Sequence, residues 1–361
     1  MYLQPDALQK RRLDRFDSWV KTFARPEQVC EIDVNASGYR FVRRFSKFFN
    51  LPELSRLFAQ VSVFYATDDG DLPEFSAYND VVIDRSEELA AYIDEICVRT
   101  EKIRSKKVAA TQDNMLKITT DGRKAALDLA LVGKEQKYDN TSKIFNCAEN
   151  VLRIYKEYEG CTQLIFCDYS TPCGANFSVY KKLQMQLVLA GIPEKEIAFI
   201  HSYTSEISRV KLYSDFNAGK VRIIIGSTFK LGLGANVQKK LKAIHHIDVP
   251  WRPADMVQRE GRILRRGNDN DEVFIYRYII KGSFDAYSWQ ILETKQRFIS
   301  QFLSGSSYSR TASDLENNVL TYSEVKALAV SDPRMKLLAE KENELRNLHV
   351  LYMQELEARE D

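Results

Sequence analysis

Four arginines crowd into the ten-residue stretch "QREGRILRRG" at residues 258–267. Planar guanidinium groups bind carboxylates and phosphates through paired hydrogen bonds, so such a cluster suits a ligand with several negative oxygens. The formal net charge of the whole chain is only +2, so the cluster is a local feature rather than part of a strongly basic protein. A solvated basic helix face is the alternative interpretation, and the surrounding sequence has to decide between the two.

The arginines are predicted to lie on a helix. The stretch "DVPWRPADMVQREGRILRRG" leaves an apolar strand pattern, and its prolines indicate that a helix begins shortly afterwards. At helical spacing Gln258, Arg262 and Arg265 share one face. Arg259 and Arg266 point elsewhere on such a helix, and for these two we favour an ordinary solvated or ion-paired role.

A glycine-rich stretch, "GSTFKLGLGANVQ", follows a strand pattern that ends near Ile225. Gly232 and Gly234 would let the backbone come close to a phosphate or to another backbone. Ser227 and Thr228 add hydroxyl donors at the end of the strand. The stretch lacks the third glycine of a dinucleotide fingerprint and the lysine of a P-loop, so by itself it is a weak indication of function.

Strand and helix patterns alternate between residues 141 and 303. The apolar strand patterns are "QLIFCD", "IAFIHS", "VRIIIGS", "AIHHIDV" and "EVFIYRYI", with helical patterns between the earlier ones. Continuous apolar runs bounded by turns are typical of strands buried on both faces of a parallel sheet. The sequence therefore predicts an α/β domain with a doubly wound parallel sheet, whose ligands bind at the carboxyl ends of the strands.

The remainder of the chain divides into two parts. Residues 1–140 are predicted to form a mixed, mainly helical region, with a hairpin turn at "NASG" and a helix over residues 84–105. Residues 304–361 read as a polar linker followed by a charged helical tail. The six cysteines form no Cys-x-x-Cys pair, and the N-terminus has no apolar signal segment. Buried free thiols, a cytoplasmic location and no membrane association are the resulting expectations.

Gln258, Arg259, Gly261, Arg262 and Arg265 resemble the sixth motif of superfamily-two helicases. A longer ordered set is similar to the second lobe of the Swi/Snf family of DNA-dependent ATPases, whose pattern includes "STRAGGLGIN", "DWNP" and "Q-x-x-x-R-x-x-R-x-G". The matching residues are Ser227, Thr228, Gly232, Gly234, Asn236, Trp251, Pro253, Gln258, Arg262, Arg265, Gly267, Tyr276, Arg277 and Gly282. Other stretches, such as "NMLKITTDGRKAALD", are similar to helicase-like proteins of phages and conjugative elements.

The resemblance implies a RecA-like second helicase lobe and a role for each matched position. Arg262 and Arg265 would be arginine fingers, and Gln258 would help to place the phosphates or the attacking water. The ATP-contacting set would be Gly234, Asn236, Asp255, Gln258, Arg262 and Arg265. The set that contacts the DNA backbone, without reading base sequence, would be Ser227, Thr228, Lys230, Gly232 and Trp251. No metal ligand is expected among these residues.

One departure from the family limits what the chain can do alone. No Gly-x-x-x-x-Gly-Lys-Ser/Thr sequence occurs, so the first lobe, which would bind most of the ATP and the Mg²⁺, is expected to lie upstream. The expected function is the C-terminal half of an ATP-dependent DNA translocase or helicase, inactive without that lobe. Its expected partners are DNA, the upstream lobe and a linked adenine-specific DNA methyltransferase. The alternative is a non-catalytic module that binds nucleic acid or protein.

Overall fold

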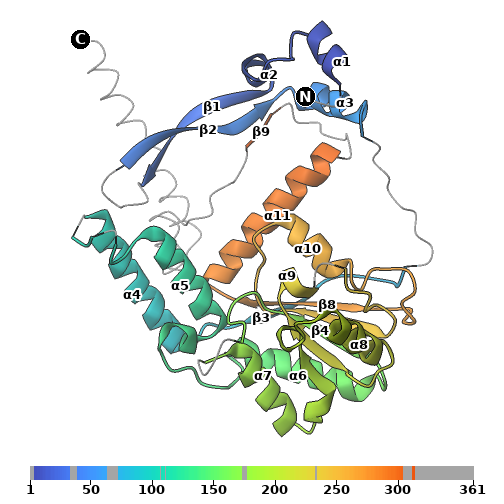
Figure 1. Cartoon of the computed structure of the whole chain (residues 1–361). Coiled ribbons are helices and arrows are strands. Elements are labelled where there is room, and N and C mark those ends of the chain that lie inside the picture. Colours follow the sequence, from blue (N-terminus) through green and yellow to red (C-terminus); the bar gives the residue numbers. More distant parts are fainter. Residues whose placement is uncertain are drawn as a thin grey trace. The chain divides into compact units, whose positions relative to one another are not determined.

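The computed structural model describes residues 4–32, 39–62, 72–105, 107–109, 111–172, 177–231, 234–303 and 311–313 (Figure 1). The chain divides into two compact units, which are treated separately below. The flanking unit comprises residues 1–68, 97–118 and 290–361, and the sheet unit comprises residues 69–96 and 119–289. Among the described helices, none is both long and apolar enough to cross a membrane.

The flanking unit contains a small helical core and an antiparallel ladder. Its elements are α1 (Pro5–Lys10), α2 (Phe16–Phe23), β1 (Ala24–Ile32), β2 (Tyr39–Phe49), α3 (Leu51–Ala59) and β9 (Thr311–Ser313). Leu8, Leu13, Phe23 and Leu57 are buried together. Strands β1 and β2 pair antiparallel, which confirms the predicted hairpin, although the "NASG" turn itself lies outside the described residues. The charged tail predicted for residues 332–361 also lies outside them.

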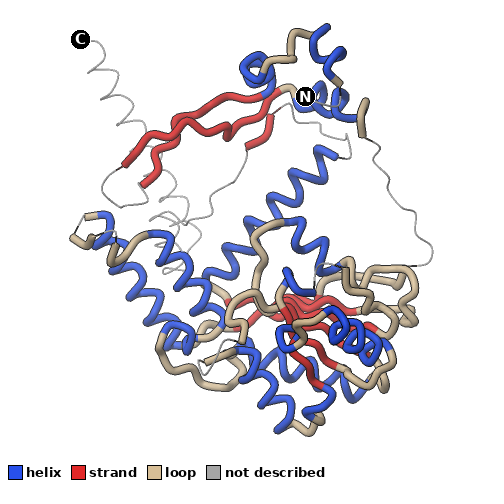
Figure 2. The backbone as a smooth tube through the Cα atoms, in the orientation of Figure 1, coloured by secondary structure: helices blue, strands red, loops and turns tan. Residues whose placement is uncertain are grey.

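The sheet unit is built on six parallel strands in the order β3-β8-β7-β4-β6-β5 (Figure 2). The strands are β3 (Asn79–Ile83), β4 (Thr162–Phe166), β5 (Ile197–Phe199), β6 (Ile223–Gly226), β7 (Leu241–His246) and β8 (Phe274–Ile280). Five of the six coincide with the apolar runs identified in the sequence. Because helices flank the sheet and every strand pair is parallel, the predicted doubly wound α/β fold is confirmed.

Helices connect these strands and cover both faces of the sheet. They are α6 (Lys143–Glu157), α7 (Val179–Leu189), α8 (Glu206–Asn217), α9 (Thr228–Leu231) and α10 (Pro253–Glu260), with α4 (Glu87–Arg104), α5 (Met115–Leu127) and α11 (Phe284–Leu303) at its margins. Leu164 and Phe166 of β4 point into a buried cluster with Leu212 of α8. Gln163 points to the other face, where its amide donates to the Val151 carbonyl of α6. Alternation along β4 thus separates the two layers of helices.

Strand β3 comes from the part of the chain before residue 141, which the sequence division assigned to a separate region. It adds to the outer edge of β8 in parallel register, with Asp80 opposite Arg277. The two side chains form a bidentate ion pair with distances of 2.6 and 2.7 Å. The short polar run "NDVVI" alternates in burial, as expected for an edge strand, and this made it less visible in the sequence than the fully buried strands.

Helix α5 carries a glycine in its interior for a steric reason. A Cβ atom at Gly122 would lie 2.5 Å from the aromatic ring of Phe284, which is buried at the start of α11. A glycine in a helix interior costs about 1 kcal/mol relative to alanine. Here it allows α5 to pack directly on the Phe284 ring. The next residue, Arg123, is thereby placed at the carboxyl edge of the sheet.

Candidate functional site

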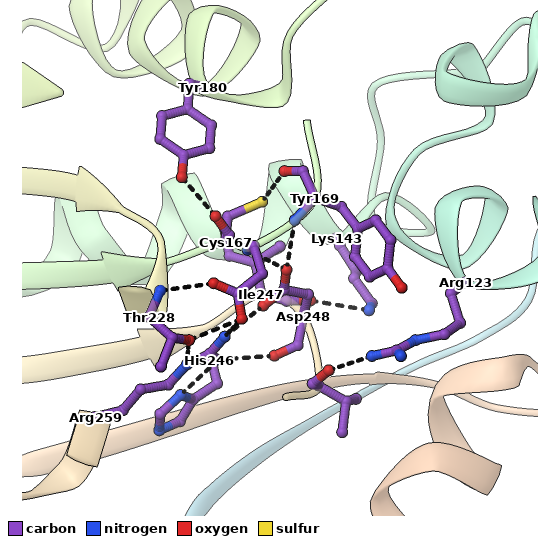
Figure 3. A network of polar contacts seen from close by, with 12 residues as sticks. Arg123, Lys143, Cys167, Tyr169, Tyr180, Thr228, His246, Ile247, Asp248 and Arg259 are labelled. Carbon is purple, nitrogen blue, oxygen red and sulfur yellow. Dashed lines mark hydrogen bonds and ion pairs between the residues drawn. The ribbon is translucent and has the colours of Figure 1, made fainter. Parts of the chain in front are cut away.

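The carboxyl ends of β4, β6 and β7 lie side by side at one edge of the sheet, because these neighbouring strands are parallel. Each strand is followed by a polar side chain. Asp168 follows β4, Ser227 and Thr228 follow β6, and Asp248 follows β7. Figure 3 shows that the polar groups at this edge converge on one guanidinium group, that of Arg259 from α10.

Arg259 is fully buried and joins all three strand ends. Its Nη2 donates to Asp168 Oδ2 at 2.7 Å and to Asp248 Oδ1 at 3.0 Å. Its Nε donates to Thr228 Oγ1 at 2.8 Å. Asp248 Oδ2 in turn accepts the backbone N–H groups of Asp168 and Tyr169. We call Arg259, Asp168, Asp248 and Thr228 the arginine clamp.

Two members of the arginine clamp, Asp168 and Arg259, have pKa values shifted towards their charged forms. Burial alone would raise the pKa of Asp168, but the Arg259 guanidinium and the hydrogen bonds from Thr228 outweigh it and lower that pKa. Burial opposes the charge on Arg259, yet the carboxylates of Asp248 and Asp168 raise its pKa. Removing one member from such a buried group leaves uncompensated charge, so the clamp fixes α10 against the strand ends.

The sequence led us to expect that Arg259 is either solvated or ion-paired. The side chain is ion-paired, as expected, but it is buried rather than solvated. Its partners Asp168 and Asp248 were not among the predicted site residues. Both stand directly after an apolar strand run, in "FCD" and "HHID", and this position is the signal that could have identified them.

The predicted helix over the arginine stretch ends earlier than expected. Helix α10 stops at Glu260, and Gly261 is its C-cap residue. A Cβ atom at residue 261 would lie 2.9 Å from the Val257 carbonyl, which favours glycine there. The expectation that Gln258, Arg262 and Arg265 share a helix face is therefore wrong, because the two arginines lie in the turns beyond α10.

Those turns nevertheless bring Arg262 and Arg265 into electrostatic contact. Arg262 is half-buried, and its Nη1 donates to the Ala235 carbonyl of the glycine-rich stretch at 2.7 Å. Burial lowers the pKa of Arg262, and the positive charge of Arg265 lowers it further. Arg265 is exposed, as is Arg266. Two like charges are thus held near each other at the carboxyl edge.

The other residues expected to contact ATP lie in the glycine-rich stretch and on α10. Gly234 is exposed and has a φ of +68°, a conformation that favours glycine. Asn236 is exposed, and its carbonyl accepts the side-chain amide of Asn217 at 2.8 Å. Asp255 and Gln258 are half-buried on α10. Gly232 lies outside the described residues.

The residues expected to contact DNA have different environments. The Thr228 hydroxyl donates to Asp168 and accepts from Arg259, and its backbone N–H also binds Asp168. Because its hydroxyl and its backbone N–H both donate within the arginine clamp, Thr228 is not available as a donor to a DNA phosphate. Ser227 is buried beside it, Lys230 is half-buried on α9, and Trp251 is 45% exposed.

Arg123 is a residue of this edge that sequence reasoning missed. It is 7% exposed, and its Nη2 donates to the Val249 carbonyl. Its guanidinium carbon lies 3.8 Å from the ring centroid of Trp251 and 5.1 Å from that of Tyr169. The signal in the sequence was the neighbouring Gly122. A glycine destabilises a helix interior, so its presence there indicates that another group packs closely against the helix.

A second group of ionisable side chains lies behind the arginine clamp. His246 Nδ1 is 3.3 Å from Arg259 Nη1, and its Nε2 is 3.8 Å from Glu260 Oε1. Burial, with a further contribution from Arg259, lowers the pKa of His246 well below its usual value, so this imidazole is neutral. Burial raises the pKa of Glu260 to about 7, against the opposing influence of Tyr78, Arg277 and Arg259.

Comparison with known proteins agrees with this geometry. Residues 144–267, which include β4, β6, β7 and the arginine stretch, match the helicase conserved C-terminal domain family. This part of the chain is therefore similar to the helicase conserved C-terminal domain. A stretch of 93 residues is 39% identical to the "Defense against restriction protein B" of Escherichia phage P1, and it makes up 26% of this chain but only 4% of that protein.

Three solved structures are similar to this chain at low sequence identity. The C-terminal part of the Fun30 ATPase domain is 15% identical with a TM-score of 0.48, and the match covers 75% of this chain and 99% of that one. The DEAD-box protein SrmB of E. coli is 14% identical with a TM-score of 0.30, covering 40% and 79%. Dbp5 of S. cerevisiae is 19% identical with a TM-score of 0.32, covering 43% and 36%.

Proposed function

We propose that this chain supplies the second ATPase lobe of a Swi/Snf-type DNA translocase or helicase, with Arg262 and Arg265 as its arginine fingers. The observation that carries the proposal is the pair of guanidinium groups at the carboxyl edge of the sheet. Burial and the charge of Arg265 both lower the pKa of Arg262, so a negative group placed beside the pair would be stabilised. The phosphates of ATP, bound against this edge by another lobe, would supply that negative charge.

The surrounding contacts explain how the two arginines would be held ready. The arginine clamp fixes α10, and α10 leads directly into the turn that carries Arg262. The bond from Arg262 to Ala235 ties that turn to the glycine-rich stretch. Arg265 is exposed beside it and can reach a phosphate oxygen of a neighbouring lobe. Gln258, in the last turn of α10, would help to place the phosphates or the water.

The donor groups at this edge fit phosphate better than a metal ion. ATP, when bound, supplies the transferable γ-phosphoryl group, and Gly234, Asn236 and Asp255 would line its other contacts. The carboxylates of Asp168 and Asp248 are committed to Arg259 and to backbone N–H groups. Over the described part of the chain no three His, Cys, Asp or Glu side chains group into a metal site. The proposal assigns Mg²⁺ and most of the ATP contacts to the first lobe, as the family resemblance implies.

DNA is the proposed track, bound through its backbone by Ser227, Lys230 and Trp251. Such contacts are independent of sequence and weaken as salt rises. The phage P1 relative supports an origin in a mobile element, and the free thiols Cys97, Cys147, Cys161 and Cys167 are in keeping with a cytoplasmic location. The linked DNA methyltransferase stays a prediction from the sequence alone.

The proposal is tested by ATP turnover in a protein that carries both lobes. Arg262→Ala and Arg265→Ala should each keep the fold and the DNA binding but lower turnover on the order of 10³-fold. Lysine at either position should rescue poorly, because a point charge cannot bridge two phosphate oxygens. Arg266→Ala is the matched control, and the 361-residue chain alone should not hydrolyse ATP above background. Normal turnover in the Arg265→Ala protein would favour the non-catalytic module instead.

A further inference from the structure

Three polar side chains that gather behind the arginine clamp have buried atoms with open hydrogen-bonding capacity. They are His246 at the end of β7, Glu260 at the end of α10 and Trp289 on α11. His246 Nε2, Glu260 Oε1 and Trp289 Nε1 have no hydrogen-bond partner among the described residues. The two rings meet edge to face at 6.3 Å between centroids, and His246 Nε2 is 3.8 Å from Glu260 Oε1. Buried polar atoms are normally paired, so this group needs a physical explanation.

The contacts of His246 fix which of its nitrogens carries a hydrogen. Arg259 Nη1 lies 3.3 Å from Nδ1 (Figure 3), and a guanidinium group can only donate, so Nδ1 is an acceptor. Burial and the charge of Arg259 keep the pKa of His246 low and the ring neutral. A neutral imidazole has one N–H group, which must then be at Nε2. The open nitrogens of His246 and Trp289 are therefore both donors, whereas the open Glu260 oxygen is an acceptor.

The charge of Glu260 depends on groups from several elements. The Tyr78 hydroxyl, just before β3, donates to Glu260 Oε2 at 3.2 Å. Arg259 on α10 and Arg277 on β8 are the nearby cations, and Arg277 is itself paired with Asp80. Burial raises the pKa of Glu260 to about 7, although Tyr78 and both arginines oppose this shift. The side chain is thus present in both its neutral and its ionised form near neutral pH.

Ionisation of Glu260 changes how strongly it attracts the open donors. A hydrogen bond between N–H and oxygen needs a distance of about 2.7–3.2 Å between the heavy atoms, so the 3.8 Å separation from His246 is too long. Hydrogen bonds to a carboxylate are shorter and about twice as strong as those to a neutral oxygen. A movement of less than about 1 Å would close the gap. The ionised form therefore favours a closed contact, and the protonated form favours the open one.

The backbone of Glu260 transmits such a movement to the turn beyond α10. Its carbonyl accepts the N–H groups of Ile263 at 3.0 Å and of Leu264 at 2.9 Å. Arg262 lies within this hydrogen-bonded turn, and its own side chain is attached to the Ala235 carbonyl. A small displacement of Glu260 therefore alters where the Arg262 guanidinium lies.

We infer that Glu260 is a positioning residue whose carboxylate, by closing on His246, sets the turn that carries Arg262. Protonation opens the contact and displaces the guanidinium from the place that a γ-phosphoryl group needs. Glu260 does not touch the nucleotide in this scheme, so it acts on the rate of turnover rather than on ATP binding. The inference rests on the proposed role of Arg262 and adds a proton-dependent control to it.

The first test measures ATP turnover between pH 5 and 8 in a protein that carries both lobes. The ratio of wild-type kcat to that of Glu260→Gln should be near one at the acid end and rise through about pH 7. At the alkaline end it should reach about 10–100, as expected for a catalytic group misplaced by a fraction of an ångström, with KM for ATP little changed. Glu260→Asp keeps a carboxylate and should recover part of the pH-dependent rise. Glu157→Gln, which alters an exposed carboxylate at the end of α6, is the matched control and should follow wild type.

The second test uses NMR of the 361-residue chain labelled with ¹⁵N-histidine, and it does not depend on turnover. His246 should have a hydrogen on Nε2 and none on Nδ1, and the Nε2–H signal should shift with a midpoint near pH 7 in wild type but not in Glu260→Gln. A hydrogen on Nδ1, or a kcat ratio that does not vary with pH, would overturn the positioning role and leave the proposed ATPase lobe intact. Normal turnover in the Arg262→Ala protein would overturn the proposed function, and the positioning role with it.

Discussion

Arg259 and Arg222 are buried arginines at opposite ends of the six-stranded sheet, and their guanidinium groups are satisfied by different means. At the carboxyl end Arg259 binds two carboxylates and a hydroxyl group that come from three separate strand ends. At the amino end Arg222 donates to the carbonyls of Tyr158 and Cys161, at 2.7 and 2.9 Å. Lys242 likewise donates to the Glu272 carbonyl at 2.7 Å and lies over two aromatic rings.

The difference separates a stabilising end of the sheet from the end that carries the proposed site. Carbonyls and aromatic rings carry no net charge, so the contacts at the amino end are local, and the loss of one partner leaves neutral groups. The arginine clamp instead pairs the buried guanidinium of Arg259 with the buried carboxylate of Asp248 and the exposed carboxylate of Asp168, and the loss of Arg259 leaves both without their counter-ion. The amino end therefore contributes packing, whereas the carboxyl end couples several loops to the turn that carries Arg262 and Arg265.

The largest expected effect comes from breaking the arginine clamp. Arg259→Leu should lower the free energy of unfolding by about 3–5 kcal/mol, because the buried carboxylate of Asp248 is left without its counter-ion. Urea denaturation measures this difference. Adding Asp248→Asn to the leucine variant should restore part of the loss. A destabilisation below about 1 kcal/mol would show that water reaches the carboxylates and that the clamp is not a closed unit.

A smaller effect is expected where α5 packs on the sheet unit. Gly122→Ala should destabilise the protein by about 1–3 kcal/mol, because the new Cβ atom overlaps the Phe284 ring. The same change should raise the exposure of Trp251 to a fluorescence quencher, since Arg123 moves with α5. Combining it with Phe284→Leu makes room for the methyl group and should recover part of the stability. No change in stability would indicate that α5 does not pack closely on that ring.

Titration of Glu260 should give a pH-dependent effect at the carboxyl end. Its pKa in the folded state is about 7, above the value of 4.5 for an unperturbed side chain. The folded state therefore binds more protons between these values, so the contribution of Glu260 is greatest below pH 4.5 and declines as pH rises towards 7. The slope cannot exceed about 1.4 kcal/mol per pH unit. Glu260→Gln should remove this slope from urea denaturation measured between pH 5 and 8. A variant that keeps the wild-type slope would assign it to another group.

The smallest effect is expected at the amino end. Arg222→Ala should destabilise the protein by about 1–2 kcal/mol, in line with hydrogen bonds from a charged donor to neutral carbonyls. It should leave DNA binding unchanged. Thermal or urea unfolding with Arg259→Leu as the reference provides the comparison. A loss as large as that of Arg259→Leu would remove the distinction between the two ends.

The strands of the sheet and its binding edge could be predicted from the sequence for a simple reason. Buried parallel strands are continuous apolar runs, and their carboxyl ends meet at one edge whatever the details of packing. "QLIFCD" and "VRIIIGS" are runs of this kind, and both became neighbouring strands. The half-exposed β3 has a polar start and carried no comparable pattern.

The inner arrangement of the site could not be predicted in the same way. Helical spacing placed Arg262 and Arg265 on one face, but Gly261 ends α10 before either residue. Which arginine is buried depends on where Asp168 and Asp248 stand in three dimensions, and spacing along the chain does not contain that information. Arg123 reaches the same edge from α5, far from the motifs, through a contact that only packing on Phe284 determines.

The pairing of β3 with β8 has a consequence for how the chain is made. Asp80 and its partner Arg277 are 197 positions apart, and the strands between them occupy the rest of the sheet. At a synthesis rate of about 5–20 residues per second, β3 leaves the ribosome roughly 10–40 s before its partner exists. The inner strands β4, β6 and β7 can pair during this interval, because each lies closer in sequence to its neighbours. Strand β3, the first strand of this sheet to be synthesised, is therefore the last to join it. Until β8 emerges, the backbone groups of β3 are open to pairing with any other exposed strand.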